Sequence, residues 1–161
     1  MAAKSELDGV DRKILRILTS DGRASYQAIA DEVGLSRPAV MERVKRLEES
    51  QYITGYAVRL DRGKLGLPIT AFIAVRYNSL AGVGDDPGMR ELREHPGVLE
   101  CHHVAGDDCY IIKVAVPAIE AIEDVLRSVR DGAGKALVTT KTTIVLSTTF
   151  EKPGLVPAEM D

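Results

Sequence analysis

Tryptophan is absent from this 161-residue chain and aromatic residues make up only 4%, so any hydrophobic core must be built from aliphatic side chains. The only two cysteines, Cys101 and Cys109, are too few for a disulfide framework. The longest apolar runs, such as residues 71–75, fall far short of the roughly 20 residues of a membrane-spanning helix. The charged N-terminal segment also lacks the apolar stretch of a signal peptide. These absences together predict a cytoplasmic protein that does not enter the membrane.

Positive charge is scarce overall, because 21 Lys and Arg stand against 24 Asp and Glu, a net charge of −3. That balance excludes a uniformly basic nucleic-acid coat protein. The two halves differ in sign, however. Residues 1–67 hold 12 basic and 10 acidic residues, a net of +2, and the remainder holds 9 and 14, a net of −5. The chain is long enough for two small domains, and the charge asymmetry predicts that they do different work.

Apolar residues recur with helical spacing in three short segments of the first 50 residues. They predict three helices whose N-caps are Asp8, Ser25 and Ser36, since a side-chain oxygen there can accept from a free backbone amide. The first helix should end near residues 21–22. Gly34 should end the second, because a sharp turn at that point favours a positive φ. The third helix should run to about residue 50.

Two short strands are expected after the third helix, at residues 52–56 and 57–60, around a turn at Thr54-Gly55. Three helices followed by such a wing describe a winged helix-turn-helix domain over residues 1–60. Residues 61–67, which include Gly63 and Gly66, are the best candidate for a linker.

The second half changes to the alternating pattern of strands. The expected order is strand, helix, strand, strand, helix, strand, which is the ferredoxin-like βαββαβ unit. The fold class is therefore α+β, with this domain over residues 68–152 and a tail over 153–161. The expected elements are strands at 69–77, 98–104, 109–116 and 137–150, and helices at 79–96 and 119–129.

Two strand segments, 111–116 and 144–146, are apolar at successive positions. A sheet with helices on one face and solvent on the other should alternate instead. Continuous apolar strands imply that both faces are buried, so we expect the sheet of a second copy to cover the face that the helices leave open.

The third helix has the chemistry of a DNA reader. Its outer face is basic between residues 37 and 46, and in helix-turn-helix proteins this helix lies in the major groove. Arginine pairs with guanine, Glu42 can accept from cytosine, and hydroxyls and helix N-termini suit phosphates. The alternative is a three-helix bundle with a charged, solvated face. The residues expected at DNA are Ser25, Tyr26, Ser36, Arg37, Pro38, Ala39, Met41, Glu42, Arg43, Lys45 and Arg46.

The order and spacing of several short motifs resemble the Lrp/AsnC family of bacterial and archaeal transcriptional regulators over roughly residues 7–152. The motifs are Leu7-Asp8-x-x-Asp11-x-x-Ile14-Leu15, Gly34-Leu35-Ser36-x-Pro38, Arg43-Val44-x-x-Leu47, Ile53-x-Gly55-Tyr56, Glu100-Cys101 and Val104-x-Gly106-Asp107. The resemblance implies a DNA-binding domain, then a regulatory domain through which the chain forms a homodimer that assembles further to an octamer.

The resemblance also implies a small-molecule effector, expected to be an amino acid. A glycine-containing turn can hold a carboxylate with backbone amides, and a neighbouring aspartate can pair with an ammonium group. The same residues also suit a plain hairpin turn. The residues assigned to the effector are Val104, Ala105, Gly106, Asp107, Asp108, Thr140 and Thr142.

Other classes of function fit less well. Cys101, His102, His103 and Cys109 could place at most three ligands on one side of a hairpin, without the second Cys pair of a structural zinc site, so no metal or other cofactor is expected. No P-loop, Rossmann fingerprint or nucleophile elbow occurs, so an enzyme is not expected. An amino-acid-binding module without sequence-specific DNA function remains the alternative.

Overall fold

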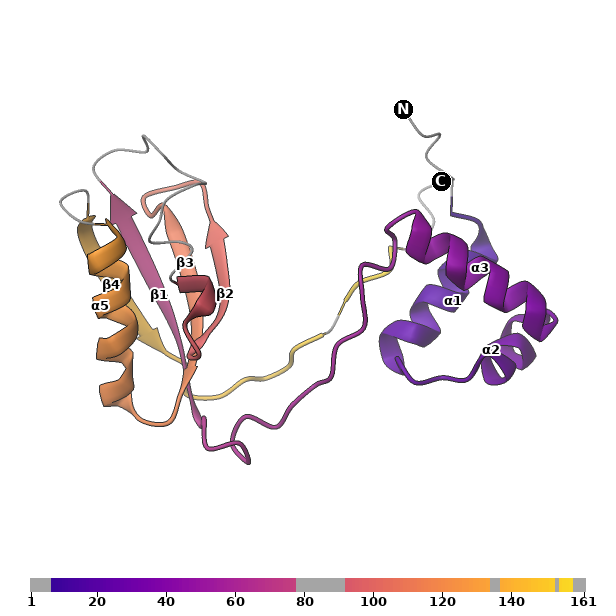
Figure 1. Ribbon diagram of the computed structural model, residues 1–161, viewed down its shortest axis with the longest axis horizontal. Helices are drawn as coiled ribbons and strands as arrows, with labels where there is room; N and C mark the ends of the chain where they lie inside the picture. Colours follow the sequence, from indigo (N-terminus) through magenta and orange to yellow (C-terminus); the bar gives the residue numbers. More distant parts are fainter. Residues whose placement is uncertain (1–6, 78–91, 134–136, 153, 158–161) are drawn as a thin grey trace. The chain divides into compact units, whose positions relative to one another are not determined.

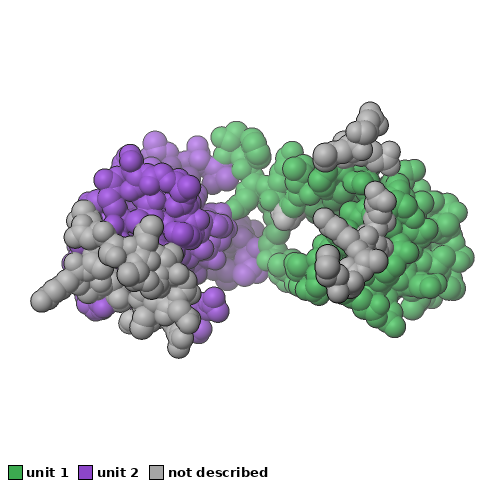
Figure 2. Space-filling view, turned by 90° about the horizontal axis from the view of Figure 1, so that it is seen from above, with its two compact units in different colours: residues 1–59, 149–161 green, residues 60–148 purple. Residues whose placement is uncertain are grey.

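The computed structural model describes residues 7–77, 92–133, 137–152 and 154–157 of the chain. The chain divides into two compact units, residues 1–59 with 149–161 and residues 60–148 (Figure 2). The first unit holds three helices and the second a four-stranded sheet (Figure 1). None of the helices in the described part of the chain is long and apolar enough to cross a membrane.

The three expected helices of the first unit are confirmed as α1 (Gly9–Ser20), α2 (Tyr26–Val33) and α3 (Arg37–Glu49). Their caps are also as expected. The Ser25 hydroxyl accepts from the Ala28 amide at 3.1 Å, and the Ser36 hydroxyl accepts from the Ala39 amide at 3.4 Å. Gly34 ends α2 at a φ of 73°, a left-handed conformation that glycine adopts without a steric cost.

The core of this unit is small and aliphatic. Ile14 of α1, Ile29 of α2 and Val44 of α3 are fully buried, and the buried set is completed by Ala30, Val40 and Leu47. Burial of one large aliphatic side chain stabilises a fold by about 1.5–3 kcal/mol. The three helices therefore hold together chiefly through the stripes that the periodicity predicted.

The prediction of a β-wing after α3 is wrong. Residues 52–60 form no strand, because the backbone just after α3 is used to close that helix. Gln51 adopts a φ of 60°, and the Tyr52 and Ile53 amides both donate to the Leu47 carbonyl, at 2.9 and 3.1 Å. The side chains of Tyr52 and Ile53 also pack against the helical core. The segment 54–60 is left extended without a hairpin partner.

In the second unit four strands form one antiparallel sheet in the order β2-β3-β1-β4. They are β1 (Ile69–Tyr77), β2 (Val98–His103), β3 (Tyr110–Val116) and β4 (Leu137–Ile144). The final strand is shorter than expected, since it ends at Ile144 and not at residue 150. Most of the helix expected over 79–96 lies outside the described residues, although residues 92–94 are helical.

The second expected helix begins as a short 3₁₀ turn, η1 (Ile119–Ala121), and continues as α5 (Ile122–Ala133), which packs on one face of the sheet (Figure 1). Ala71, Ile73 and Val75 of β1 lie buried on this helix-facing side. Because side chains alternate along a strand, Phe72 and Arg76 lie on the opposite side, which we call the open face. Phe72 is 40% exposed there.

The unit boundaries differ from the expected domains at the C-terminal end. Residues 149–161 group with the helices of the first unit, although the sheet domain was expected to reach residue 152. Arg59 donates to the Glu151 carbonyl at 3.3 Å, and Gly154 lies close to Thr19 of α1. Residues 62–66, in the expected linker, form turns.

Candidate nucleic-acid interface and effector site

Helix α3 separates an apolar face from a polar one, as the sequence predicted. Val40, Val44 and Leu47 are buried in the core. The side chains expected to read DNA lie outside it. Met41 is 44% exposed and the Lys45 side chain 74%, and Arg37, Pro38 and Glu42 are exposed as well, whereas Ala39 is half-buried.

Two cations on α3 are available to a ligand. Lys45 has only a 3.6 Å pair with Glu49 on the same exposed surface, and such a pair contributes at most about 1 kcal/mol. Within the described part of the chain Arg37 makes no ion pair. Both side chains can therefore turn to phosphates or base edges at little cost.

Ser25 and Tyr26 lie at the N-terminus of α2, and Ser36 lies at the N-terminus of α3. The two serine oxygens accept backbone hydrogen bonds as N-caps, which leaves each hydroxyl proton free to donate to a phosphate. Tyr26 opens α2 and is 37% exposed. The structure therefore confirms both serines as caps, and a contact from these residues to phosphate stays a prediction.

Arg43 and Arg46 are placed differently from the other basic residues of α3. Arg43 donates to Asp8 at 2.6 Å and to Asp11 at 2.8 Å. Arg46 donates to both carboxylate oxygens of Asp11, at 2.6 and 2.8 Å. Both guanidinium groups thus face α1, and the hydrogen bonds that Arg43 donates to Asp8 and Asp11 raise its pKa.

The pairing of Asp8 and Asp11 with these arginines was not predicted from the sequence, which indicated Asp8 only as a helix cap and Asp11 only as part of a family motif. A detectable signal existed, however. Asp8 and Asp11 are three positions apart, as are Arg43 and Arg46, and both pairs border a buried stripe. Matching spacing on two helices allows two ion pairs to form side by side.

In the second unit the expected effector turn closes the β2–β3 hairpin. The Val104 amide donates to the Cys109 carbonyl at 3.0 Å, and Gly106 has a φ of 135°. Ala105, Gly106 and Asp107 are exposed, and Asp108 is half-buried. The turn therefore presents backbone amides and a carboxylate to solvent.

This turn is attached to the end of β1. The Cys109 amide donates to the Val75 carbonyl at 2.8 Å, and Arg76 pairs loosely with Asp108 at 3.8 Å. Arg76 brings a guanidinium group to the turn, and the sequence analysis did not find it. Its contact with the turn depends on pairing between β1 and β3, which sequence spacing does not reveal.

Thr140 and Thr142 are not brought together with the turn. They pair with Val75 and Ile73, so they lie on the helix-facing side of the sheet. Thr142 lines a separate pocket against η1 and α5, together with Ile119, Glu120, Ile122, Glu123, Leu126 and Ile144. The β4 residue opposite Arg76 is Thr139.

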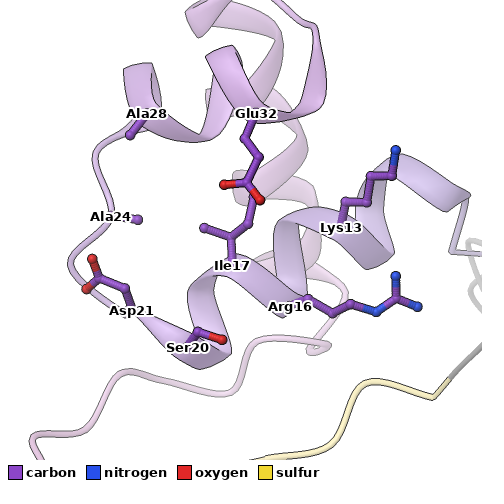
Figure 3. Close-up of a pocket in the computed structure, with 8 residues that line it drawn as sticks. All are labelled: Lys13, Arg16, Ile17, Ser20, Asp21, Ala24, Ala28 and Glu32. Carbon is purple, nitrogen blue, oxygen red and sulfur yellow. The ribbon is translucent and has the colours of Figure 1, made fainter.

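A second pocket, of about 670 Å³, lies between α1 and α2 (Figure 3). Its charged lining is mixed, with Lys13, Arg16, Asp21 and Glu32, and it contains no residue that the sequence analysis assigned to DNA or effector. Because both signs of charge line this open groove, it favours no single class of ligand.

The Cys and His residues of the hairpin are split between the two faces of the sheet. The His103 ring packs on Tyr110 with a centroid distance of 5.2 Å. His102 lies on the other face, 3.1 Å from Glu100. That contact and a 3.3 Å bond from Lys113, opposed by partial burial, lower the pKa of Glu100. In the described part of the chain, no three His, Cys, Asp or Glu side chains are grouped so as to hold a metal ion.

Comparison with known proteins also divides the chain into two domains. Residues 7–48 match the AsnC-type helix-turn-helix domain, and residues 70–155 match the Lrp/AsnC ligand binding domain. The chain belongs to the Lrp/AsnC family. Its members here include the HTH-type transcriptional regulator LrpA of Mycobacterium tuberculosis, which is 35% identical over 94% of this chain and 97% of the relative.

Two further members of the Lrp/AsnC family have different amino acids in their names or titles. The leucine-responsive regulatory protein of Escherichia coli is 34% identical over 75% of this chain and 74% of its own. A feast or famine regulatory protein from M. tuberculosis was solved in complex with L-methionine. That structure has a TM-score of 0.83 and 34% identity, and the match covers 94% of this chain and 100% of the other. This Lrp/AsnC protein is therefore a transcriptional regulator with a helix-turn-helix DNA-binding domain and a ligand-binding domain.

Proposed function

We propose that this regulator reads DNA with α3 and senses a free amino acid at the turn 104–108, in the cytoplasm, and that it acts by binding without catalysis. The observation that supports DNA reading is the exposed face of α3. Among the described residues, Arg37 makes no ion pair there and Lys45 makes only a loose, exposed one with Glu49. A helix presented in this way fits the major groove, with its N-terminal residues nearest the bases.

The test of α3 is a salt-dependent binding titration on a duplex that the full chain has selected from a random-sequence pool. We expect Arg37→Ala combined with Lys45→Ala to weaken binding by tenfold or more. The slope of log K against log salt should also become shallower by about 0.9 for each phosphate that the variant no longer neutralises. Unchanged binding would refute the assignment of α3.

The chemistry of the turn fits a zwitterion. Arg76 and the backbone amides around Gly106 suit an α-carboxylate, and Asp107 or Asp108 suits an α-ammonium group. The loose 3.8 Å contact between Arg76 and Asp108 could be exchanged for contacts to the two ends of one ligand. The L-methionine complex of a relative supports this class of effector.

A thermal-shift screen of the twenty amino acids tests the effector. A ligand at 100 times its Kd stabilises the folded state by about 2.7 kcal/mol, which gives a readable rise in Tm. We expect at least one amino acid to raise the Tm of the wild type, and the rise to disappear in Asp107→Asn. If no amino acid shifts the Tm, the effector assignment is refuted.

We further propose that the open face of the sheet joins two copies into a homodimer, and that dimers assemble to an octamer. Phe72 is 40% exposed on this face, beside the half-buried Ile111 of β3 and Ala74 of β1. A second sheet would bury these side chains. The dimer would then place two α3 helices about 34 Å apart on a pseudo-palindromic site, and an effector that favours one assembly would change DNA occupancy.

A further inference from the structure

A buried carboxylate lies between α1 and α3. Asp11 is 1% exposed, although aspartate is rarely buried unless it is paired. Three arginine bonds shorter than 3 Å reach it, one from Arg43 and two from Arg46. Asp8, which caps α1, takes a further bond from Arg43 at 2.6 Å. We call these four residues the clamp.

The acidic side of the clamp is held rigidly by α1 itself. The Asp11 amide donates to the Asp8 carboxylate at 2.7 Å, and the Asp8 amide donates back to Asp11 at 3.4 Å. This reciprocal capping box fixes both carboxylates relative to the first turn. The positive end of the α1 dipole also favours negative charge at that place.

The clamp supplies what the aliphatic core cannot. Apolar contacts are non-directional, so the stripe of Val40, Val44 and Leu47 leaves α3 some freedom to rotate and slide. One terminal nitrogen of each guanidinium group bonds two acceptors: Nη1 of Arg43 bonds Asp8 and Asp11, and Nη2 of Arg46 bonds both oxygens of Asp11. Such charge-assisted bonds are directional, and two anchors three residues apart fix a helix about its own axis. Base readout needs this orientation, because side chains must be placed to within about 0.5 Å.

We propose that Asp8 and Asp11 are positioning residues for DNA recognition, acting through Arg43 and Arg46. The two arginines hold the reading helix to α1 and do not neutralise phosphates. This inference rests on α3 as the DNA reader. It also reassigns two side chains that the charge pattern alone placed at DNA, and leaves Arg37 and Lys45 as the cations that reach DNA.

The experiment compares affinity and salt slope for two duplexes of equal length, one selected by the wild-type full chain and one unrelated. Arg46→Gln should lower the ratio of specific to non-specific affinity by tenfold or more and leave the salt slope unchanged. Asp11→Asn should do the same, and the double variant should be no worse than Asp11→Asn alone, because Asp11→Asn already disturbs the contact that Arg46→Gln removes. Arg37→Gln is the contrast, and should flatten the slope by about 0.9 per copy.

Glu49→Gln is the matched charge control. It removes one negative charge from the exposed end of α3, so it should bind both duplexes slightly more tightly, whereas Asp11→Asn makes the same change in charge and should lose specificity. A purely structural clamp would lower the Tm but leave the affinity ratio of the folded protein unchanged, so the ratio is the deciding readout.

Two results would overturn the proposal. One is a salt slope that falls by about 0.9 per copy in Arg46→Gln while Asp11→Asn binds more tightly, since Arg46 would then be a phosphate contact. The other is an affinity ratio within twofold of wild type in both Arg46→Gln and Asp8→Asn, two exposed positions that keep the test valid if Asp11→Asn fails to fold. Unchanged binding by Arg37→Gln would instead refute α3 as the reader, and with it the role of the clamp.

Discussion

The helical unit and the sheet unit of this regulator are each stabilised by a different set of internal contacts. The helical unit buries six apolar residues and orients its helices with ion pairs around one buried carboxylate. Among the described residues of the sheet unit, eleven buried apolar or aromatic side chains form one cluster between the sheet and its helices, and Phe72 is exposed on the open face. The helical unit thus combines an aliphatic core with directional ion pairs, whereas the sheet unit leaves an apolar side chain exposed on the face where we propose that a second copy packs.

The largest expected effect concerns the open face of the sheet. Phe72→Asp places a charge where we propose that a second copy packs, and burial of an unpaired charge costs several kcal/mol. We expect the dimer Kd to rise by about 1000-fold, which corresponds to about 4 kcal/mol. Sedimentation velocity should show a monomer at micromolar concentration. Leu65→Asp, a change at a similarly exposed leucine outside the sheet, should remain assembled, and a stable wild-type monomer would contradict the proposal.

The next largest effect tests whether the two hydrophobic cores unfold independently. Ile14→Ala should destabilise the helical unit by about 2–5 kcal/mol, the usual cost of such a cavity. Ile112→Ala should do the same in the sheet unit. Calorimetry should show each change moving its own transition, because both residues are fully buried in separate clusters. Equal shifts of both transitions would show that the units unfold as one.

A smaller effect is expected at the effector turn. Arg76→Gln removes the guanidinium group that lies 3.8 Å from Asp108. We expect it to weaken binding of the amino acid identified in the thermal-shift screen by about tenfold. Arg127→Gln, on the exposed side of α5, serves as the control and should bind normally. Normal affinity in Arg76→Gln would exclude Arg76 from the effector site.

The smallest effect is a pH dependence in the clamp. Partial burial opposes ionisation of Asp8, but bonds from the Asp11 amide and from Arg43 outweigh it and lower its pKa from 3.8. A lowered pKa stabilises the fold above pH 3.8, and this contribution disappears as the pH falls through the folded value. Asp8→Asn should therefore lose less stability than wild type between pH 5 and about pH 2 in acid-unfolding curves. Asp31→Asn should follow the wild type, and identical curves for Asp8→Asn would exclude this contribution.

What the sequence predicted well was local. The caps Ser25 and Ser36 and the turn at Gly34 depend on residues within one helical turn, and all three were confirmed. The failures came from contacts distant in the chain or from competition between them. The wing did not form because the Tyr52 and Ile53 amides close α3.

The same limit applies to the candidate site. Arg43 and Arg46 were assigned by charge alone, since their aspartate partners lie more than thirty residues away in the chain. The face on which Thr140 lies depends on its pairing with Val75 and on a bulge at Arg76/Tyr77. Neither can be read from the spacing of the threonines. Helix periodicity was therefore predictable, whereas side-chain partners between elements were not.

The most direct measurement of the central claim, that one unit reads DNA and the other senses an amino acid, is a single anisotropy titration of the selected duplex. It compares the wild type with the Arg37→Ala/Lys45→Ala variant, each with and without the amino acid from the screen. We predict that the amino acid changes wild-type affinity by fivefold or more, within the usual range of allosteric coupling. The double variant should bind tenfold or more weakly and still gain Tm from the ligand. The account would be contradicted if the amino acid left the wild-type affinity for the duplex unchanged and the double variant bound the duplex as tightly as the wild type.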